Sequence, residues 1–317
     1  MTNLPVLYQN NLQFRAVYES LCANGNAVVS GLIGSKHSFL VKSLFDQHPD
    51  TTIWILNNKE EAAYFLNDLE VLLPNPPLFF PSSYRRPYNI EETDNANVLL
   101  RAETLQKLKE LPKQLVVTYP EALFEQVLTP KELKRKKLSI NIGDELSIDF
   151  VNETLFEFGF SRVDFVAEPG EFAVRGGILD VHSFSHDQPF RIEFFGDEVD
   201  TIRSFDVTSQ RSTQSLNQAK ILANIEQKEE EEVRQSLLAF PSANTLVCVQ
   251  NESVITAELD ALFKHAQKAF ENISGEIKRQ SPKELFIDGK TFNSKPANPV
   301  LVQSTPLVLR SITRHEG

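Results

Sequence analysis

Residues 30–38 (SGLIGSKHS) approach the pattern of a phosphate-binding loop. Such a loop needs G-x-x-x-x-G-K-[ST]: glycines let backbone N–H groups reach the phosphates, the lysine neutralises them and the hydroxyl holds Mg²⁺. Gly31 takes the first glycine position and Ser38 the hydroxyl position, but Lys36 and His37 replace the second glycine and the lysine. A side chain then stands where backbone must approach phosphate, and a mostly neutral imidazole replaces a fixed cation. We therefore predict a degenerate nucleotide loop.

The other half of an NTPase site would be an acidic pair at the end of a later buried strand. The best candidate by position is the segment 247–253 (VCVQNES), where Gln250 and Asn251 stand in place of carboxylates. An amide cannot match aspartate as a charged partner of magnesium. These residues favour an NTPase-type fold kept as a scaffold over a working ATPase.

The remaining residues of chemical interest predict neither catalysis nor a metal site. His182 and His186 are four apart in a loop with Ser and Pro and have no marked third ligand, so we expect surface histidines. Cys22 and Cys248 lie far apart in the sequence, so they imply neither a disulfide framework nor a metal site. The patterns G-x-S-x-G, H-E-x-x-H and C-x-x-C do not occur in the sequence.

The elements that must carry the loop alternate between strand and helix. Residues 26–30, 52–56 and 114–118 are short apolar runs typical of buried strands. Between them, 59–69 and 97–111 carry leucines at the spacing of three and four that indicates helices. This alternation predicts a largely parallel, doubly wound α/β sheet.

The pattern changes after the basic run at 134–137 (KRKK), which we interpret as a solvated face rather than a phosphate-binding patch. From 138 to 222 the segments are short, Gly and Pro separate them, and hydrophobicity alternates with period two. This segment holds six Lys/Arg and fifteen Asp/Glu, so most of the negative charge of the chain lies here.

Helical and buried-strand patterns return after residue 223. We predict an acidic helix at 229–238, a strand at 245–250 and a long helix at 252–272. The simplest arrangement is an α/β domain in two parts, 1–136 and 223–317. A smaller β-rich α+β domain, 137–222, is then inserted between the two parts.

The inserted segment contains a strongly patterned hairpin at 190–205. Alternation predicts one core face, which comprises Phe190, Ile192 and Phe194. The other face carries Arg191 beside Phe195, which we expect to be exposed. Gly196–Asp197 supplies the turn. Gly176–Gly177 interrupts the preceding strand, as a bulge or a close backbone approach would. Arginine and aromatic residues are enriched at protein interfaces, so this face is either a docking surface or is covered by another segment of the same chain. The alternation alone does not decide between these two interpretations.

Two motifs carry a family resemblance: EPGEFAVRGGILDVH at 168–182 and FRIEFFGDEVDTIRSFDVTSQRS at 190–212. They resemble the signature shared by the UvrB excision-repair protein and the N-terminal region of bacterial transcription-repair coupling factors. Weaker similarity extends over 79–94 (FFPSSYRRPYNIEETD) and 115–123 (LVVTYPEAL). UvrB keeps an intact GKT loop and a Tyr-rich hairpin that this sequence lacks, whereas coupling factors carry a degenerate loop.

The resemblance implies that the α/β domain is a degenerate helicase-like domain of the P-loop type. It also implies a non-catalytic module whose inserted domain binds UvrA. Matching the family motifs residue by residue places the UvrA contacts at Arg175, Arg191 and Phe195. The resemblance also implies that RNA polymerase, DNA, ATP and Mg²⁺ belong to motor and polymerase-binding domains whose motifs are absent from this sequence, so we expect a fragment. The alternative is a UvrB-like ATP-dependent DNA helicase with an atypical nucleotide site.

Composition sets further limits on the class of protein. The net charge of −11 lowers the expectation of tight DNA binding, which relies on phosphate contacts. No apolar run approaches the roughly 20 residues that span a bilayer, and the first residues lack a signal-peptide pattern. With 41% hydrophobic and 24% charged residues, we expect a globular cytoplasmic protein.

Overall fold

The computed structural model describes residues 12–24, 26–29, 31–83, 95–226, 232–241, 244–272, 280–294, 300–301 and 307–311. The chain forms two compact units. The α/β unit comprises Met1–Glu92, Lys107–Val127 and Arg234–Gly317, and the β-rich unit comprises Thr93–Gln106 and Leu128–Val233. The segment 137–222, predicted as an inserted domain, lies within the β-rich unit. The two predicted domain boundaries, at 136/137 and 222/223, themselves stay a prediction.

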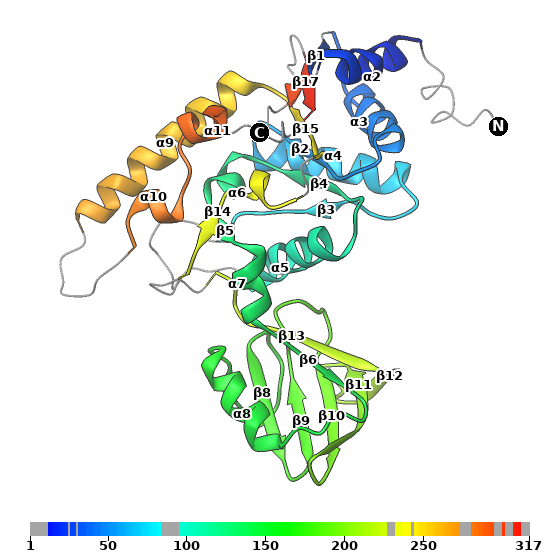
Figure 1. The fold of residues 1–317 in the computed structure, drawn as a ribbon, viewed down its shortest axis with the longest axis vertical. Coiled ribbons are helices and arrows are strands. Elements are labelled where there is room, and N and C mark those ends of the chain that lie inside the picture. Colours follow the sequence, from blue (N-terminus) through cyan, green and yellow to red (C-terminus); the bar gives the residue numbers. More distant parts are fainter. Residues whose placement is uncertain are drawn as a thin grey trace. The chain divides into compact units, whose positions relative to one another are not determined.

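Among the described residues, seven strands form the sheet of the α/β unit in the order β1-β17-β16-β15-β2-β4-β3 (Figure 1). They are β1 (Asn26–Val29), β2 (Thr52–Ile55), β3 (Leu78–Phe79), β4 (Leu115–Thr118), β15 (Leu246–Val249), β16 (Val300–Leu301) and β17 (Leu307–Ser311). Neighbours from β15 through β2 and β4 to β3 pair in parallel, whereas β17 pairs antiparallel with β1. The prediction of a mixed α/β protein with a parallel sheet is thereby confirmed.

Helices precede or connect these strands. They are α2 (Leu12–Asn24), α3 (Lys36–Gln47), α4 (Lys59–Leu72), α6 (Pro120–Phe124), α9 (Glu252–Glu271), α10 (Pro282–Leu285) and α11 (Gly289–Ser294), while α5 (Asn95–Glu110) contributes residues to both units. Local chemistry sets their ends: the Asn58 side chain accepts the Glu61 N–H at 2.8 Å and so caps α4. The strands and helices predicted from apolar spacing are confirmed within one to three residues at each end where the structure describes them.

The acidic helix predicted at 229–238 is wrong where the structure describes this segment. Residues 227–231 lie outside the described part, as do 84–94 of the weaker family motif. The segment continues as β14 (Arg234–Gln235) and a 3-10 turn, η2 (Leu237–Ala239). Leu237 and Leu238 are both buried, and consecutive buried positions do not suit one face of a solvated helix.

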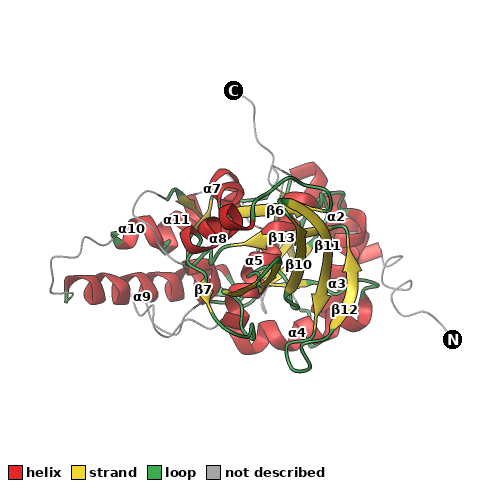
Figure 2. Cartoon of the chain, turned by 90° about the horizontal axis from the view of Figure 1, so that it is seen from below, coloured by secondary structure: helices red, strands yellow, loops and turns green. Residues whose placement is uncertain are grey.

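A six-stranded sheet forms the β-rich unit in the order β12-β11-β10-β9-β8-β7, and a separate pair joins β13 to β6. The strands are β6 (Lys137–Asn141), β7 (Ser161–Arg162), β8 (Glu171–Arg175), β9 (Ile178–Val181), β10 (Phe190–Phe195), β11 (Glu198–Phe205), β12 (Ser212–Leu216) and β13 (Gln218–Leu222). Figure 2 shows β10, β11 and β12 side by side. The short elements β5 (Val127–Leu128) and α7 (Pro130–Arg135) lead into β6, and α8 (Ile148–Glu157) lies between β6 and β7.

One face of this sheet is core. Ile192 of β10, Leu179 of β9 and Phe172 of β8 pack there with Val151 of α8 and Ile221 of β13, so α8 and the β6–β13 pair cover the same face. The predicted hairpin is confirmed, because β10 and β11 pair antiparallel around the Gly196–Asp197 turn. The inward position of Ile192, which is fully buried, is confirmed with it.

Gly176–Gly177 does not interrupt a strand but forms the two-residue turn between β8 and β9, so that part of the prediction is wrong. Gly176 has φ +61°, a conformation that hairpin turns of this length require and that glycine adopts without strain. The expected close approach does occur at Gly177, where a Cβ atom would stand 2.8 Å from the Phe194 carbonyl oxygen.

Candidate docking surface

The sheet face opposite the core carries a set of charged side chains. In the antiparallel register, Arg191 of β10 lies opposite Asp180 of β9, and Arg175 of β8 lies opposite Ile178, two residues from Asp180. Because side chains in register share a face and alternate along a strand, Arg175, Asp180 and Arg191 lie on one face. Ile192 points to the other face.

Asp180 joins the two arginines. Its side chain is only 1% exposed. Arg191 binds it with two hydrogen bonds, Nε to Oδ1 at 2.7 Å and Nη2 to Oδ2 at 2.8 Å, and Arg175 donates from Nη2 to Oδ2 at 2.6 Å. Charge-assisted bonds of this kind are the strong class in proteins, and the bidentate pair fixes the plane of the guanidinium. One buried carboxylate therefore positions both cations.

Arg191 is largely an internal residue of the sheet. Its third guanidinium nitrogen, Nη1, donates to the Gln210 carbonyl at 3.2 Å, and its guanidinium carbon lies 4.6 Å from the Phe205 ring centroid. The hydrogen bonds to Asp180 raise the pKa of Arg191, with burial acting in the opposite direction. The structure thus places Arg191 against Asp180 and Phe205 rather than beside Phe195, and its side chain is 20% exposed.

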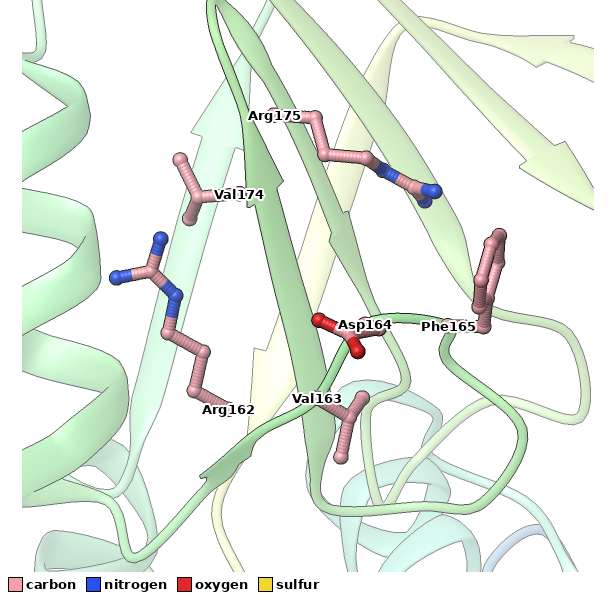
Figure 3. Close-up of a pocket in the computed structure, with 6 residues that line it drawn as sticks. All are labelled: Arg162, Val163, Asp164, Phe165, Val174 and Arg175. Atoms are coloured by element: carbon pink, nitrogen blue, oxygen red, sulfur yellow. The ribbon is translucent and has the colours of Figure 1, made fainter.

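Arg175 is more open than Arg191. Its side chain is 44% exposed, and its guanidinium carbon lies 5.1 Å from the ring centroid of Phe165. Figure 3 shows Arg175 extending from β8 toward the Phe165 ring, with Asp164 beside Phe165 on the same loop. Since a guanidinium has five N–H donors and Asp180 takes one from Arg175, donors remain for a partner.

Phe195 lies at the far end of β10 and is 83% exposed. The adjacent turn residue Gly196 has φ +64°, which lets the chain reverse directly after the aromatic side chain. Phe195 is four positions after Arg191, which is roughly 13 Å along a strand. The structure therefore brings Arg175 and Arg191 together and presents Phe195 as a separate exposed anchor.

Sequence reasoning missed two residues of this surface, Asp180 and Phe165. Asp180 is the one charged residue in the strand 178–181 (ILDV), which was a usable signal because a lone carboxylate in a buried strand needs a cationic partner. Phe165 lies in a loop without periodicity, so its position over Arg175 had no signal in the pattern. Phe165 is 65% exposed.

The degenerate loop lies between β1 and α3. Gly31 and Gly34 have φ +78° and +58°, and Lys36 begins α3 with an exposed side chain. His37 is buried, and its Nδ1 donates to the Gly34 carbonyl at 2.9 Å. The Ser38 hydroxyl donates to the Asp68 carboxylate of α4 at 2.9 Å.

The two amides at the carboxyl end of β15 also have structural partners. The Gln250 side-chain oxygen accepts the Asn57 N–H at 3.0 Å beside β2, and Gln250 is buried. Asn251 is the N-cap of α9, where its side chain accepts the Val254 N–H at 3.3 Å. Both side chains therefore stabilise the ends of elements.

The prediction of two surface histidines is wrong for His182. It follows β9 directly and is buried, and this burial lowers its pKa. His186 is partly exposed, and its Nδ1 donates to the Gln188 carbonyl at 2.8 Å. Across the described residues, no group of three or more His, Cys, Asp or Glu is placed to hold a metal ion.

The β-rich unit matches a known protein family. Residues 138–226, which contain the arginine-bearing sheet, match the family model described as the UvrB interaction domain. This segment is therefore similar to the UvrB interaction domain family.

The whole chain is similar to transcription-repair-coupling factors. The protein of that name from Bacillus subtilis (strain 168) is 28% identical over 336 residues, which cover 100% of this chain and 27% of the relative. The Haemophilus influenzae protein is 27% identical over a region that covers 63% of this chain and 17% of the relative. The Mycobacterium bovis protein is 42% identical over a region that covers 33% of this chain and 8% of the relative. The chain spans about a quarter of the length of the first relative. These findings confirm the resemblance identified from the motifs.

No helix in the described parts of the chain is both long enough and apolar enough to cross a membrane.

Proposed function

We propose that this chain is a non-catalytic docking module that binds UvrA and thereby recruits nucleotide-excision repair to stalled RNA polymerase. The observation that carries the proposal is the pair Arg175 and Arg191, held by buried Asp180 on the sheet face opposite the core. The family resemblance assigns the UvrA contacts to these two arginines and Phe195. Arginine and aromatic residues are the types that dominate binding energy at protein interfaces.

The fixed geometry of the arginines supports a binding role. A long side chain that becomes ordered only on binding loses conformational entropy at that moment, which weakens association. Asp180 orders both guanidiniums beforehand, and the sheet that carries them is anchored through Ile192 and its neighbours in the core. The surface is therefore preorganised for a partner.

The α/β unit is proposed as a P-loop-type scaffold without ATPase activity. The Lys36 and His37 N–H groups close turns on the Ile33 and Gly34 carbonyls at 3.4 and 3.3 Å, whereas a working loop turns such donors toward phosphate. Ser38, the residue at the Mg²⁺ position, donates to Asp68. We propose that this chain uses no cofactor, and this geometry gives no support to the helicase alternative.

The wider assignments rest on the resemblance to coupling factors. We propose that the domains are 1–136, 137–222 and 223–317, that the protein acts in the cytoplasm, and that RNA polymerase and DNA contact other domains of a longer protein. ATP and Mg²⁺ would serve an ATP-driven DNA translocase in that longer protein.

A titration of purified UvrA tests the proposal. Arg175→Ala, Arg191→Ala and Phe195→Ala should each weaken UvrA binding by roughly 1–3 kcal/mol, a typical loss at an interface hot spot. Phe150→Ala is the matched control, because Phe150 is half-exposed on α8, which covers the opposite face of the sheet.

Thermal melts of the same variants separate binding from folding. Phe195→Ala should melt as the parent does, since an exposed side chain contributes little to stability. Ile192→Ala should lose roughly 2–5 kcal/mol of stability through a core cavity and bind only as far as it folds. Unchanged UvrA affinity in folded Arg175→Ala and Phe195→Ala would show that the docking face lies elsewhere.

A further inference from the structure

A loop beside Arg175 presents an aromatic side chain that the family motifs do not assign. Residues 163–170 leave β7 and return to β8, and Phe165 projects from this loop to the exposed side of Arg175 (Figure 3). Arg162, Val163, Asp164, Phe165, Val174 and Arg175 together line a surface pocket. The Arg175 guanidinium therefore contacts both the Asp180 carboxylate and the Phe165 ring.

The loop is held in place by the sheet below it. Glu171 Oε2 accepts the N–H groups of Ala167 and Glu168 at 2.8 and 2.9 Å, and Gln210 Nε2 donates to the Val166 carbonyl at 3.1 Å. The Val166 side chain is fully buried in a small cluster with Ala173 and Phe205. Phe165 is thus an exposed aromatic residue on a fixed support, and little entropy remains to be lost when a partner covers it.

The pocket is continuous with the arginine surface. A second surface depression is lined by Arg175, Ile178, Asp180, Arg191, Glu193, Arg203 and Ser212, so Arg175 belongs to both. Two arginines and one aspartate line the first pocket. This local positive balance stands out in a segment, 138–222, where fifteen acidic residues face six basic ones. Its charge therefore complements a carboxylate.

We propose that the Phe165–Arg175 pocket is a second contact of the UvrA docking surface and receives an aspartate or glutamate side chain of UvrA. The Arg175 guanidinium donates to the carboxylate of UvrA. The Phe165 ring covers the aliphatic part of that UvrA side chain and excludes water from the ion pair. This inference rests on the proposed function, because it takes UvrA as the partner.

The test compares matched substitutions at two exposed phenylalanines. Phe165→Ala should weaken UvrA binding by roughly 5- to 150-fold, the range of an interface anchor. Phe165→Glu should weaken it further, because the new carboxylate competes for Arg175. Phe150→Ala and Phe150→Glu, on the opposite face of the sheet, should leave the affinity unchanged. Phe165→Tyr retains the ring and should retain most of the binding.

Titrations by calorimetry with purified UvrA, at low and high salt, give the readout together with a melt of each variant. The affinity of the parent should fall with added salt more steeply than that of Phe165→Glu, because that variant has already lost the ion pair. Folded Phe165→Ala and Phe165→Glu that bind as tightly as the two Phe150 variants would overturn the inference.

The outcomes also separate the inference from the proposed function. If Arg191→Ala and Phe195→Ala lose binding while both Phe165 variants keep it, the docking function stands and this pocket has no part in it. If none of these variants loses binding, the proposed docking face and the pocket fail together. If only the Phe165 variants lose binding, the pocket is the contact and the assignment of Arg191 and Phe195 is wrong.

Discussion

At the scale of single residues, Asp180 determines the geometry of the candidate docking surface. A carboxylate that is buried needs charge-assisted hydrogen bonds to offset its lost hydration, and Asp180 obtains three from two guanidiniums. Glu193 and Arg203 form another pair on the same face, but both side chains are about one-third exposed. The two pairs therefore differ in burial while sharing one sheet face.

This difference in burial predicts that neutralising Asp180 lowers the free energy of unfolding more than neutralising Glu193 does. Asp180→Asn should lower the free energy of unfolding by roughly 1.5–3 kcal/mol, since it replaces bonds between charged groups in a buried site. Glu193→Gln should cost about 1 kcal/mol or less, because exposed pairs contribute little. Urea denaturation of both variants measures the difference. Equal stability of the two variants would mean that Asp180 does not hold the arginines.

At the scale of elements, the connecting loops have different roles in the two units. In the β-rich unit, two-residue turns at Gly176–Gly177 and Gly196–Asp197 define where β8 and β10 end, and so where Arg175 and Phe195 lie. In the α/β unit, the loop before α3 directs its His37 and Ser38 side chains to partners of the same unit. The turns of the β-rich unit thus present side chains to solvent, whereas the loop before α3 directs its side chains into the α/β unit.

From the hydrogen bonds of the degenerate loop before α3, we predict that the chain neither binds nor hydrolyses ATP. His37 is bonded to Gly34, Ser38 to Asp68, and Gln250 to Asn57, so the positions for cation and metal are already used. A fluorescent ATP analogue titrated with Mg²⁺ should show no saturable binding, and phosphate release should equal the buffer blank. An intact P-loop ATPase measured in parallel is the control. Micromolar binding together with turnover would contradict the scaffold proposal.

At the scale of the whole molecule, charge separates protein docking from nucleic-acid binding. The net charge of −11 makes the chain acidic on average. Arg175 and Arg191, the two arginines of the candidate docking surface, already share the buried Asp180 carboxylate. DNA affinity depends on releasing counterions from many neutralised phosphates, which requires a continuous basic surface. A few arginines amid carboxylates suit a single acidic group of a protein better.

We therefore predict weak, salt-sensitive DNA binding at most. A mobility shift with duplex DNA at physiological salt should show no sub-micromolar complex, and weak binding at low salt should disappear as salt is added. Arg175→Ala should change this residual binding little, which would distinguish it from UvrA docking. A sub-micromolar complex at physiological salt would show that a local basic patch outweighs the net charge.

The sequence by itself determined many of the elements and the family resemblance. Apolar spacing located β1, β2, β4 and β15 of the seven-stranded sheet and the β10–β11 hairpin, because burial imposes a period of two on a half-buried strand and of 3.6 on a helix. Alternation placed Ile192 inward, and the motifs at 168–182 and 190–212 identified the class of the β-rich unit. These features are local, so neighbouring residues suffice to predict them.

Only the tertiary structure decided which side chains meet. Asp180 and Arg191 are eleven residues apart, and their contact depends on the register of β9 against β10, which a one-residue shift would abolish. The antiparallel pairing of β8 with β9 makes Gly176–Gly177 a hairpin turn, and His182 is buried, both against the expectations from spacing. Phe165 reaches Arg175 because hydrogen bonds to Glu171 and Gln210 hold an irregular loop. Such contacts between segments leave no periodic signal in the sequence, because they depend on how separate elements pack.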